Sequence, residues 1–243
     1  MTQQFYVSPE QLMKDRADFA RKGIARGRSV VVISCQDGIA LVAENPSPSL
    51  HKIGEIYDKI AFAAVGKYNE FESLRQAGVR YADVRGYSYD REDVTARGLA
   101  SVYAQSLGAV FTAEQKPFEV ELAVAEVGLT PELDHLYRLT FDGSIADEHG
   151  FIVMGGQAER VSAVIAEGWR PSLRFAGAVR LATGGLASGP DLAAEHAEAG
   201  GTLPAKAVEV AVLDRQSESS RGFRRAFRRL NDTDITALLA EED

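Results

Sequence analysis

Two strand-like runs joined by a tight turn stand at Ser29-Val30-Val31-Val32-Ile33-Ser34-Cys35, Gln36-Asp37-Gly38 and Ile39-Ala40-Leu41-Val42-Ala43-Glu44. Both runs are dominated by β-branched and apolar residues, which is typical of strands. The Asp-Gly pair between them is a strong hairpin signal, because glycine tolerates the positive φ that a tight turn requires. This segment therefore predicts a β-hairpin near the start of the chain.

A helix start precedes the hairpin. Ser8 can cap, Pro9 suits the first helical position, and Gln11 completes a capping box. The helix is predicted over residues 9–26 and should end near Gly27, with a narrow apolar stripe that includes Leu12, Phe19, Gly23 and Ile24. Such a stripe suits packing on a neighbouring chain as well as on its own domain, and periodicity alone leaves both readings open.

The rest of the chain alternates between strand and helix signals. Residues 221–229 fit helical and strand spacing equally, residues 187–202 read as a Gly-, Ala- and acid-rich surface loop, and Asp232 or Thr233 caps a short last helix that ends near Leu239. The other predicted elements are strands at 51–56 and 60–66, helices at 68–83 and 93–111, strands at 119–127, 136–141 and 151–154, helices at 158–167 and 172–186, and a strand at 206–213. This order predicts an α+β domain over residues 1–243, with two sheets packed face to face and helices outside.

Composition narrows the class of protein. The 243 residues are 45% hydrophobic, enough for a substantial core, and carry a formal charge of −8. That charge gives no general attraction to nucleic acid or anionic membranes. Cys35 is the one cysteine, so an intrachain disulfide is impossible and a reducing compartment fits. With no secretory-type N-terminus and no apolar run long enough to cross a bilayer, we expect a cytoplasmic protein.

No sequence motif indicates an active site. His51, His135, His149 and His196 lack metal-ligand spacing, and neither a Gly-x-Ser-x-Gly elbow nor a phosphate-binding loop occurs. Cys35 ends an apolar strand, where cysteine usually behaves as a small hydrophobe. We therefore expect no metal, no cofactor and no catalytic residue.

Several long segments resemble actinobacterial proteasome α subunits. They are Arg21-Lys22-Gly23-Ile24-Ala25-Arg26-Gly27, Glu44-Asn45-Pro46-Ser47, Phe62-Ala63-Ala64-Val65-Gly66-Lys67-Tyr68-Asn69-Glu70, Arg85-Gly86-Tyr87-Ser88-Tyr89-Asp90-Arg91, Val102-Tyr103-Ala104-Gln105 and Asp142-Gly143-Ser144-Ile145-Ala146-Asp147-Glu148. The resemblance covers nearly the whole chain. It implies a four-layer αββα sandwich of the N-terminal-nucleophile hydrolase type over residues 29–240, with two antiparallel sheets, preceded by the amphipathic helix.

That superfamily also contains catalytic β-type subunits, which use an N-terminal threonine whose free α-amine supports proton transfer. The matching position here is Ser29, and 28 residues precede it, so its nitrogen is an amide. We therefore expect a non-catalytic subunit. The alternatives are a catalytic β-type N-terminal-nucleophile protease or amidohydrolase, and a ring scaffold without proteolytic partners.

The resemblance also implies partners. Similar proteins form heptameric α rings that cap rings of proteasome β subunits, and admit unfolded or pupylated substrates through an axial pore. The tail at residues 1–9 would be the gate, namely Met1, Thr2, Gln3, Gln4, Phe5, Tyr6, Val7, Ser8 and Pro9. An AAA-type ATPase ring would dock its C-terminal tails in a pocket between subunits, where Lys52 and Gly27 match the family's pocket lysine and glycine.

Two departures from relatives outside the actinobacteria qualify this expectation. The Tyr-Asp-Arg gate motif of archaeal and eukaryotic α subunits is absent near the N-terminus, and Lys67 stands where archaeal relatives have an apolar residue. Gate details are therefore not transferred from those relatives, and the chemistry of the pocket is expected to differ at Lys67.

Overall fold

The computed structural model describes residues 8–188, 203–217 and 225–240. Its strands form two five-stranded sheets in which every pairing is antiparallel. Sheet A has the spatial order β10 (Phe227–Arg229), β9 (Val208–Asp214), β2 (Gly38–Glu44), β1 (Val30–Cys35) and β8 (Phe151–Met154). Sheet B has the order β3 (Ile53–Tyr57), β4 (Ile60–Gly66), β5 (Val120–Glu126), β6 (His135–Leu139) and β7 (Ile145–Glu148).

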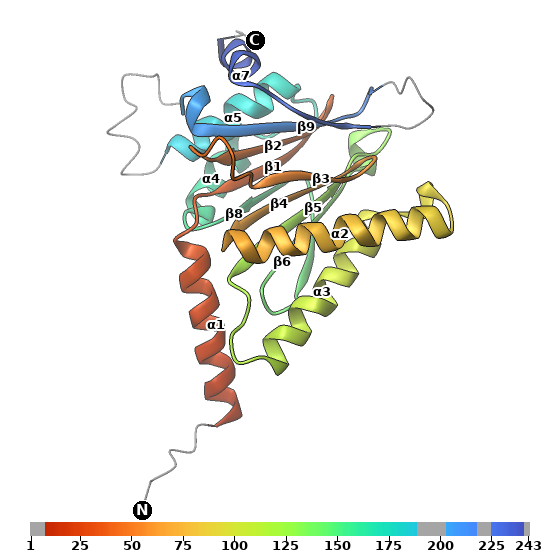
Figure 1. Ribbon diagram of the computed structural model, residues 1–243. Helices are drawn as coiled ribbons and strands as arrows, with labels where there is room; N and C mark the ends of the chain where they lie inside the picture. The colour runs from red at the N-terminus through yellow and green to blue at the C-terminus, as the bar shows by residue number, and fades with distance from the viewer. Residues whose placement is uncertain (1–7, 189–202, 218–224, 241–243) are drawn as a thin grey trace, which may run out of the picture.

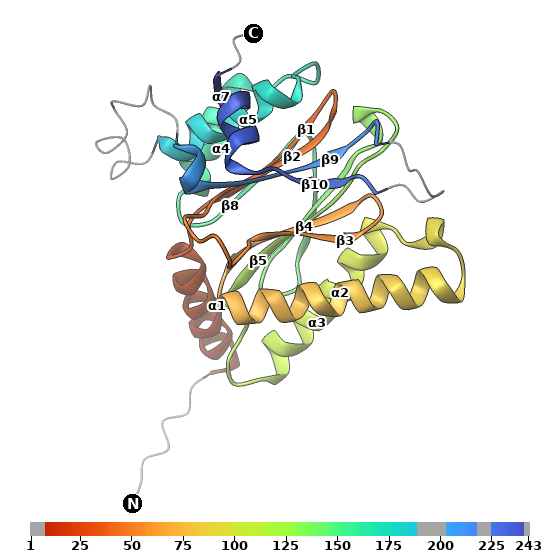
Figure 2. The same ribbon diagram turned by 45° about the horizontal axis from the view of Figure 1, so that its top comes forward.

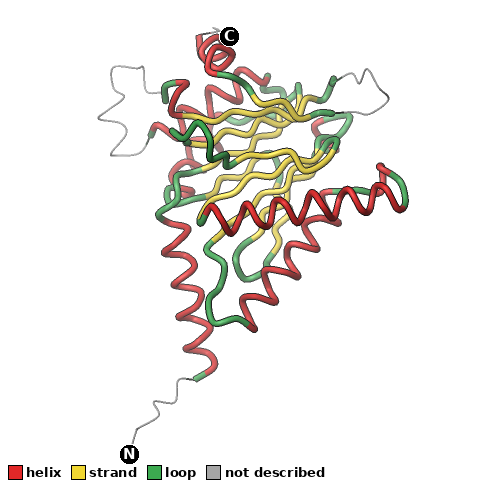
Figure 3. The backbone as a smooth tube through the Cα atoms, in the orientation of Figure 1, coloured by secondary structure: helices red, strands yellow, loops and turns green. Residues whose placement is uncertain are grey.

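Helices cover the outer faces of both sheets, which completes the four layers that the sequence predicts (Figures 1 and 2). Sheet A is covered by α4 (Ala158–Gly168), α5 (Phe175–Ala187) and α7 (Asp232–Ala240), and sheet B by α2 (Tyr68–Ser88) and α3 (Ala96–Ala113). The tube in Figure 3 shows the strands stacked between these helical layers. Short 3-10 turns lie at Arg91–Asp93, Pro131–Leu133 and Ala205–Ala207.

The β1–β2 hairpin forms as predicted and lies at the centre of sheet A. Val30 and Val32 face the core between the sheets, whereas Val31 and Ile33 face α4 and α5, so both sides of β1 are buried. This explains the unbroken apolar run, since a strand covered on both faces needs no polar alternation. Gly38 is required at the turn, because a Cβ there would collide with the carbonyl oxygen of Leu213 on β9.

The N-terminal helix α1 (Pro9–Ala25) packs on its own domain. The Ser8 hydroxyl accepts a hydrogen bond from the backbone N–H of Gln11 at 3.2 Å, which confirms the predicted cap. Ala20 and Ile24 are buried in the core between the sheets. Leu12 and Phe19 remain exposed, so this domain covers only part of the apolar stripe. Figure 1 shows the start of α1 far from the sheets.

Some local expectations were wrong. The sequence pattern predicted no strand at Ile145–Glu148, where the structure has β7. This strand is short, and most of its residues are exposed. The last helix is capped by neither Asp232 nor Thr233, because the Asn231 side chain accepts the N–H of Asp234 at 2.9 Å. The ambiguous segment ends in strand β10, and its residues 221–224 lie outside the described part, as do residues 189–202 of the predicted loop.

A buried ion pair joins the two sheets at one end. Arg215 follows β9 and Asp134 precedes β6, with Nη1 and Oδ1 2.7 Å apart and the side chains only 7% and 1% exposed. Asp134 also accepts the Ser34 hydroxyl at 2.6 Å and the Gly128 N–H at 2.9 Å. Arg215 Nη2 donates to the Cys35 carbonyl at 2.9 Å. One carboxylate thus connects the end of sheet A with the loop between β5 and β6.

Replacing this carboxylate should destabilise the chain strongly. Asp134→Ala breaks a buried ion pair and removes the acceptor of the Ser34 hydroxyl and the Gly128 N–H, a loss that typically costs about 3–5 kcal/mol. Urea unfolding of the isolated chain measures the loss, with Glu114→Ala, an exposed carboxylate at the end of α3, as the control expected within about 0.5 kcal/mol. A loss below 1 kcal/mol for Asp134→Ala would contradict the role given to this pair.

Candidate docking site

Gly27 and Lys52, the two docking residues expected from the resemblance, lie near one another at the junction between α1 and β1. Gly27 follows the end of α1, and Lys52 lies directly before β3. The Lys52 ammonium donates a hydrogen bond to the carbonyl oxygen of Arg28, the residue after Gly27, at 2.7 Å. A contact across 24 residues of sequence therefore brings the lysine to the junction.

Charges around Lys52 are mixed. Burial lowers the pKa of Lys52 to about 8, an effect that the Glu44 carboxylate opposes and the Arg28 guanidinium reinforces. Arg28 and Glu44 also pair directly, with Nε and Oε1 3.2 Å apart. Because its pKa lies near neutrality, the lysine loses most of its charge between pH 7 and pH 9, where an ordinary exposed lysine stays protonated.

A buried glutamate holds the segment that carries Lys52. Glu209 on β9 accepts the backbone N–H of Lys52 at 2.9 Å and that of Ile53 at 3.3 Å. It also accepts the Asn45 side-chain amide at 2.8 Å and pairs with Arg229. These bonds fix both ends of the loop between β2 and β3, and they explain why β3 begins at Ile53 rather than at the predicted residue 51. The one sequence signal for Glu209 is a carboxylate between apolar residues of a strand.

Packing within the chain accounts for glycine at position 27. A Cβ on Gly27 would collide with the Val65 side chain on β4. The Gly27 carbonyl accepts the N–H of Gly156 at 3.1 Å, which ties the junction to the turn after β8. A hollow of about 310 Å³ lies beside this junction and is lined by Gly27, Ser29 and Glu44, among others. Lys52 is not part of its lining and reaches the junction through Arg28.

Ser29, which the resemblance suggests as the counterpart of the superfamily nucleophile, lies inside the continuous backbone. The chain runs from α1 through Gly27 and Arg28 into Ser29, so the Ser29 nitrogen belongs to a peptide bond. The residue is buried, and its carbonyl accepts the Glu44 N–H at 3.1 Å. An amide nitrogen has no basic lone pair, so it cannot take the proton of the neighbouring hydroxyl.

Three further expectations from the sequence concern the tail at residues 1–9, Lys67 and Cys35. Of the proposed gate, Ser8 and Pro9 begin α1, and residues 1–7 lie outside the described residues. Lys67 precedes α2 with its ammonium 4.0 Å from Glu70. Cys35 is buried, and burial raises the pKa of its thiol to about 11.

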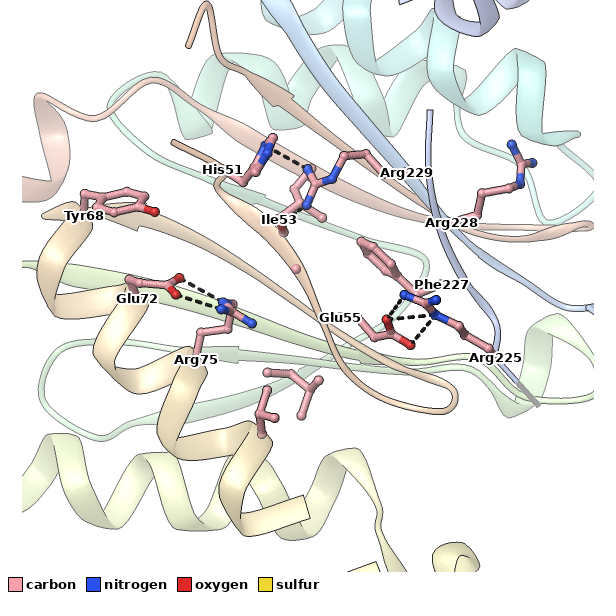
Figure 4. A pocket seen from close by; sticks show the side chains of 13 residues that line it. His51, Ile53, Glu55, Tyr68, Glu72, Arg75, Arg225, Phe227, Arg228 and Arg229 are labelled. Atoms are coloured by element: carbon pink, nitrogen blue, oxygen red, sulfur yellow. Dashed lines mark hydrogen bonds and ion pairs between the residues drawn. The ribbon is translucent and has the colours of Figure 1, made fainter. Parts of the chain in front are cut away.

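Across the described ranges, no three or more His, Cys, Asp or Glu side chains gather in a way that could hold a metal ion. No helix in the same ranges has the length and apolar character needed to cross a membrane. A larger hollow, of about 820 Å³, lies between β3, β10 and α2 (Figure 4). His51 and Ile53, the neighbours of Lys52, line it, whereas Lys52 itself does not.

Comparisons with known proteins place this architecture in a family. The model of the family described as proteasome subunit matches residues 24–193. The chain is 83% identical to the proteasome subunit alpha of Pseudarthrobacter chlorophenolicus over 240 residues, which cover 99% of this chain and 100% of that protein. It is 79% identical to the proteasome subunit alpha of an Arthrobacter species, with all of both chains covered.

A more distant relative shows the same full-length agreement. The proteasome subunit alpha of Thermomonospora curvata is 58% identical over 241 residues, which cover 99% of each chain. The match therefore includes the helix ahead of β1 as well as the sandwich. On this similarity and this fold, the chain belongs to the proteasome subunit family, as one of its alpha-type members.

Proposed function

We propose that this chain is a non-catalytic subunit of the proteasome core particle, forming outer heptameric rings that control substrate admission and dock an AAA-type ATPase ring. The observation that carries the proposal is the amide nitrogen of Ser29. Catalysis in this superfamily needs a free α-amine beside the nucleophile. Here the corresponding nitrogen is bonded to Arg28 in a backbone that continues into α1.

The packing of α1 argues against its removal as a propeptide. Cleavage before Ser29 would take Ala20 and Ile24 out of the core between the sheets. It would also uncover Val65, against which Gly27 lies. Burying one isoleucine side chain stabilises a fold by about 1.5–3 kcal/mol, so removing the whole helix would cost a sizeable part of a typical domain's stability.

The same helix supports the proposed gate at residues 1–9. The start of α1, with Ser8 and Pro9, lies far from the sheets (Figure 1), which suits a segment that meets its counterparts from other subunits. In a ring, seven such tails would converge on the pore. An activator opens a gate of this kind by binding its open arrangement more tightly than its closed one.

Docking of the ATPase tail would use the Lys52 charge. A terminal carboxylate can accept a charge-assisted hydrogen bond from an ammonium group. Lys52 already donates to a backbone carbonyl, so a carboxylate would replace or share that partner. The hydrogen bonds that Glu209 accepts from the backbone N–H groups of Lys52 and Ile53 support this role, because they fix the backbone that carries the lysine.

The remaining parts of the proposal follow from ring formation. The α rings would cap rings of β subunits and pass unfolded or pupylated proteins to their active sites. We place this activity in the cytoplasm. No cofactor enters the proposed role, because the subunit positions partners and performs no chemistry.

Coexpression with the cognate β subunit tests the proposal. We expect a mixed particle that hydrolyses peptides, with both chains present in equal numbers by native mass spectrometry, and no hydrolysis by this chain alone. Hydrolysis by the purified chain without β subunits would instead support a catalytic β-type subunit. Rings of this chain that never bind the β subunit would support a scaffold without proteolytic partners.

The charge of Lys52 should control ATPase coupling. Lys52→Ala should reduce ATPase-dependent protein degradation at least tenfold at pH 7, because the tail carboxylate loses its ammonium partner. In the unaltered particle, ATPase binding should weaken as pH rises from 7 to 9, since a pKa near 8 leaves most Lys52 side chains neutral at the upper end. Tail-peptide affinity measured across this pH range reports the effect.

Further variants of the particle separate ATPase docking from gating. Lys52→Arg keeps a positive charge throughout this pH range and should flatten the pH dependence of ATPase binding.

Deleting residues 2–9 should speed small-peptide hydrolysis by the assembled particle. Adding Lys52→Ala to this deletion should leave the faster rate unchanged. Normal ATPase coupling in Lys52→Ala would remove the lysine from the docking role, and an unchanged peptide rate after the deletion would count against the gate.

A further inference from the structure

Arg229 on β10 contacts the residues on both sides of Lys52 in the sequence (Figure 4). Its Nη2 donates a hydrogen bond to the carbonyl oxygen of Ile53 at 2.7 Å, and its Nη1 lies 3.1 Å from Nδ1 of His51. Nη1 also forms an ion pair with Glu209 on β9. Because β10 and β3 are edge strands of different sheets, this one guanidinium joins the two sheets beside the candidate docking lysine.

Glu209 needs a positive partner, because its side chain is only 6% exposed and a buried carboxylate without a cation is strongly unfavourable. Three groups could supply the charge. The Arg229 guanidinium is always protonated. The His51 ring, with Nδ1 3.3 Å from Oε1 of the carboxylate, is charged only when it is protonated. The third group is Lys52: burial lowers its pKa, and the Glu209 charge opposes that effect, so the lysine responds to this carboxylate.

The ion pair with Arg229 leaves the Lys52 ammonium available to other partners. Lys52 donates its hydrogen bond to the carbonyl oxygen of Arg28, at the junction between α1 and β1. Without the guanidinium, the negative charge of Glu209 would be unopposed. That charge would attract the ammonium more strongly and draw it away from the junction.

The other charges near Lys52 oppose one another. The Glu44 carboxylate favours the charged form of the lysine, whereas the Arg28 guanidinium disfavours it. These two groups also pair directly, with Nε and Oε1 3.2 Å apart. The second pair, between Arg229 and Glu209, is therefore the one whose balance sets how strongly the interior of the chain holds the ammonium.

We propose that Arg229 is a positioning residue for the candidate docking site: by pairing with Glu209, it keeps the Lys52 ammonium at the junction, where a partner's terminal carboxylate can bind it. The inference rests on the proposed docking function and adds a residue that acts through Glu209 rather than on the partner. The hydrogen bond from Arg229 to Ile53 serves the same end, because it fixes the start of the strand that follows the lysine.

Charge variants of this pair should move the titration of Lys52 in opposite directions. Arg229→Gln removes a repelling positive charge and should raise the pH midpoint of Lys52 by about half a pH unit or more. Glu209→Gln removes an attracting negative charge and should lower the midpoint by a similar amount. The two changes in one chain should leave the midpoint close to that of the unaltered protein. The rate at which acetic anhydride modifies Lys52 in the full chain, followed by peptide mass spectrometry across pH, gives each midpoint.

Peptide binding tests the consequence for docking. The probe is a peptide with the C-terminal sequence of the cognate ATPase, and its C-terminal amide serves as the matched probe without the carboxylate. In the particle assembled with the β subunit, Arg229→Gln should weaken binding of the free-carboxylate peptide at pH 7 about fivefold or more. Arg229→Lys keeps the charge and should bind within about twofold of the unaltered particle. A purely structural role for Arg229 would weaken binding without raising the Lys52 midpoint.

Controls make each outcome decisive. Arg228→Gln removes the same charge from the adjacent, exposed residue of β10 and should change neither measurement, since Glu209 pairs with Arg229. Circular dichroism checks that each variant is folded, and Glu209→Gln keeps the titration decisive if Arg229→Gln does not fold. A Lys52 midpoint that moves in neither single variant, or normal peptide binding by folded Arg229→Gln, would overturn the positioning role. Absence of peptide binding by the unaltered particle, with the midpoints moving as expected, would instead overturn the docking function and leave the charge relation between Arg229 and Lys52 standing.

Discussion

The packing of α1 between the ends of the two sheets is the constraint on which the structure depends. Ala20 and Ile24 fill the same core as the first strands, so the chain ahead of β1 is part of the fold. This has two consequences at one junction. Ser29 stays inside the backbone, and Arg28 presents its carbonyl to Lys52. The junction on which the proposed non-catalytic role rests is also the junction that Lys52 contacts in the candidate docking site.

Local signals in the sequence predicted the elements well, and long-range contacts explain what they missed. The hairpin and the Ser8 cap depend on neighbouring residues, so their patterns were readable. Strand β7 carries exposed side chains and is held by pairing with β6, which no pattern within it reveals. Asn231 replaced the expected cap, because several adjacent polar residues could each begin that helix.

The candidate docking site, too, was only partly predictable from the sequence. Gly27 and Lys52 were found by resemblance, and residue spacing alone would not have paired them, since the contact depends on how the β2–β3 loop folds back toward α1. Glu209, which holds that loop, comes from β9 more than 150 residues later. The hollow between β3, β10 and α2 likewise depends on sheet order and packing, because it combines segments that are distant in sequence. Chemistry carried by one segment was predictable, and chemistry assembled from several was not.

The central claim is that Ser29 remains an internal residue in the working particle. Intact mass measurement of this chain, isolated from a peptide-hydrolysing particle assembled with its β partner, tests it most directly. The account predicts a mass that includes α1 and the residues leading into Ser29. A chain that begins at Ser29, and therefore carries a free α-amine beside its hydroxyl, would contradict it.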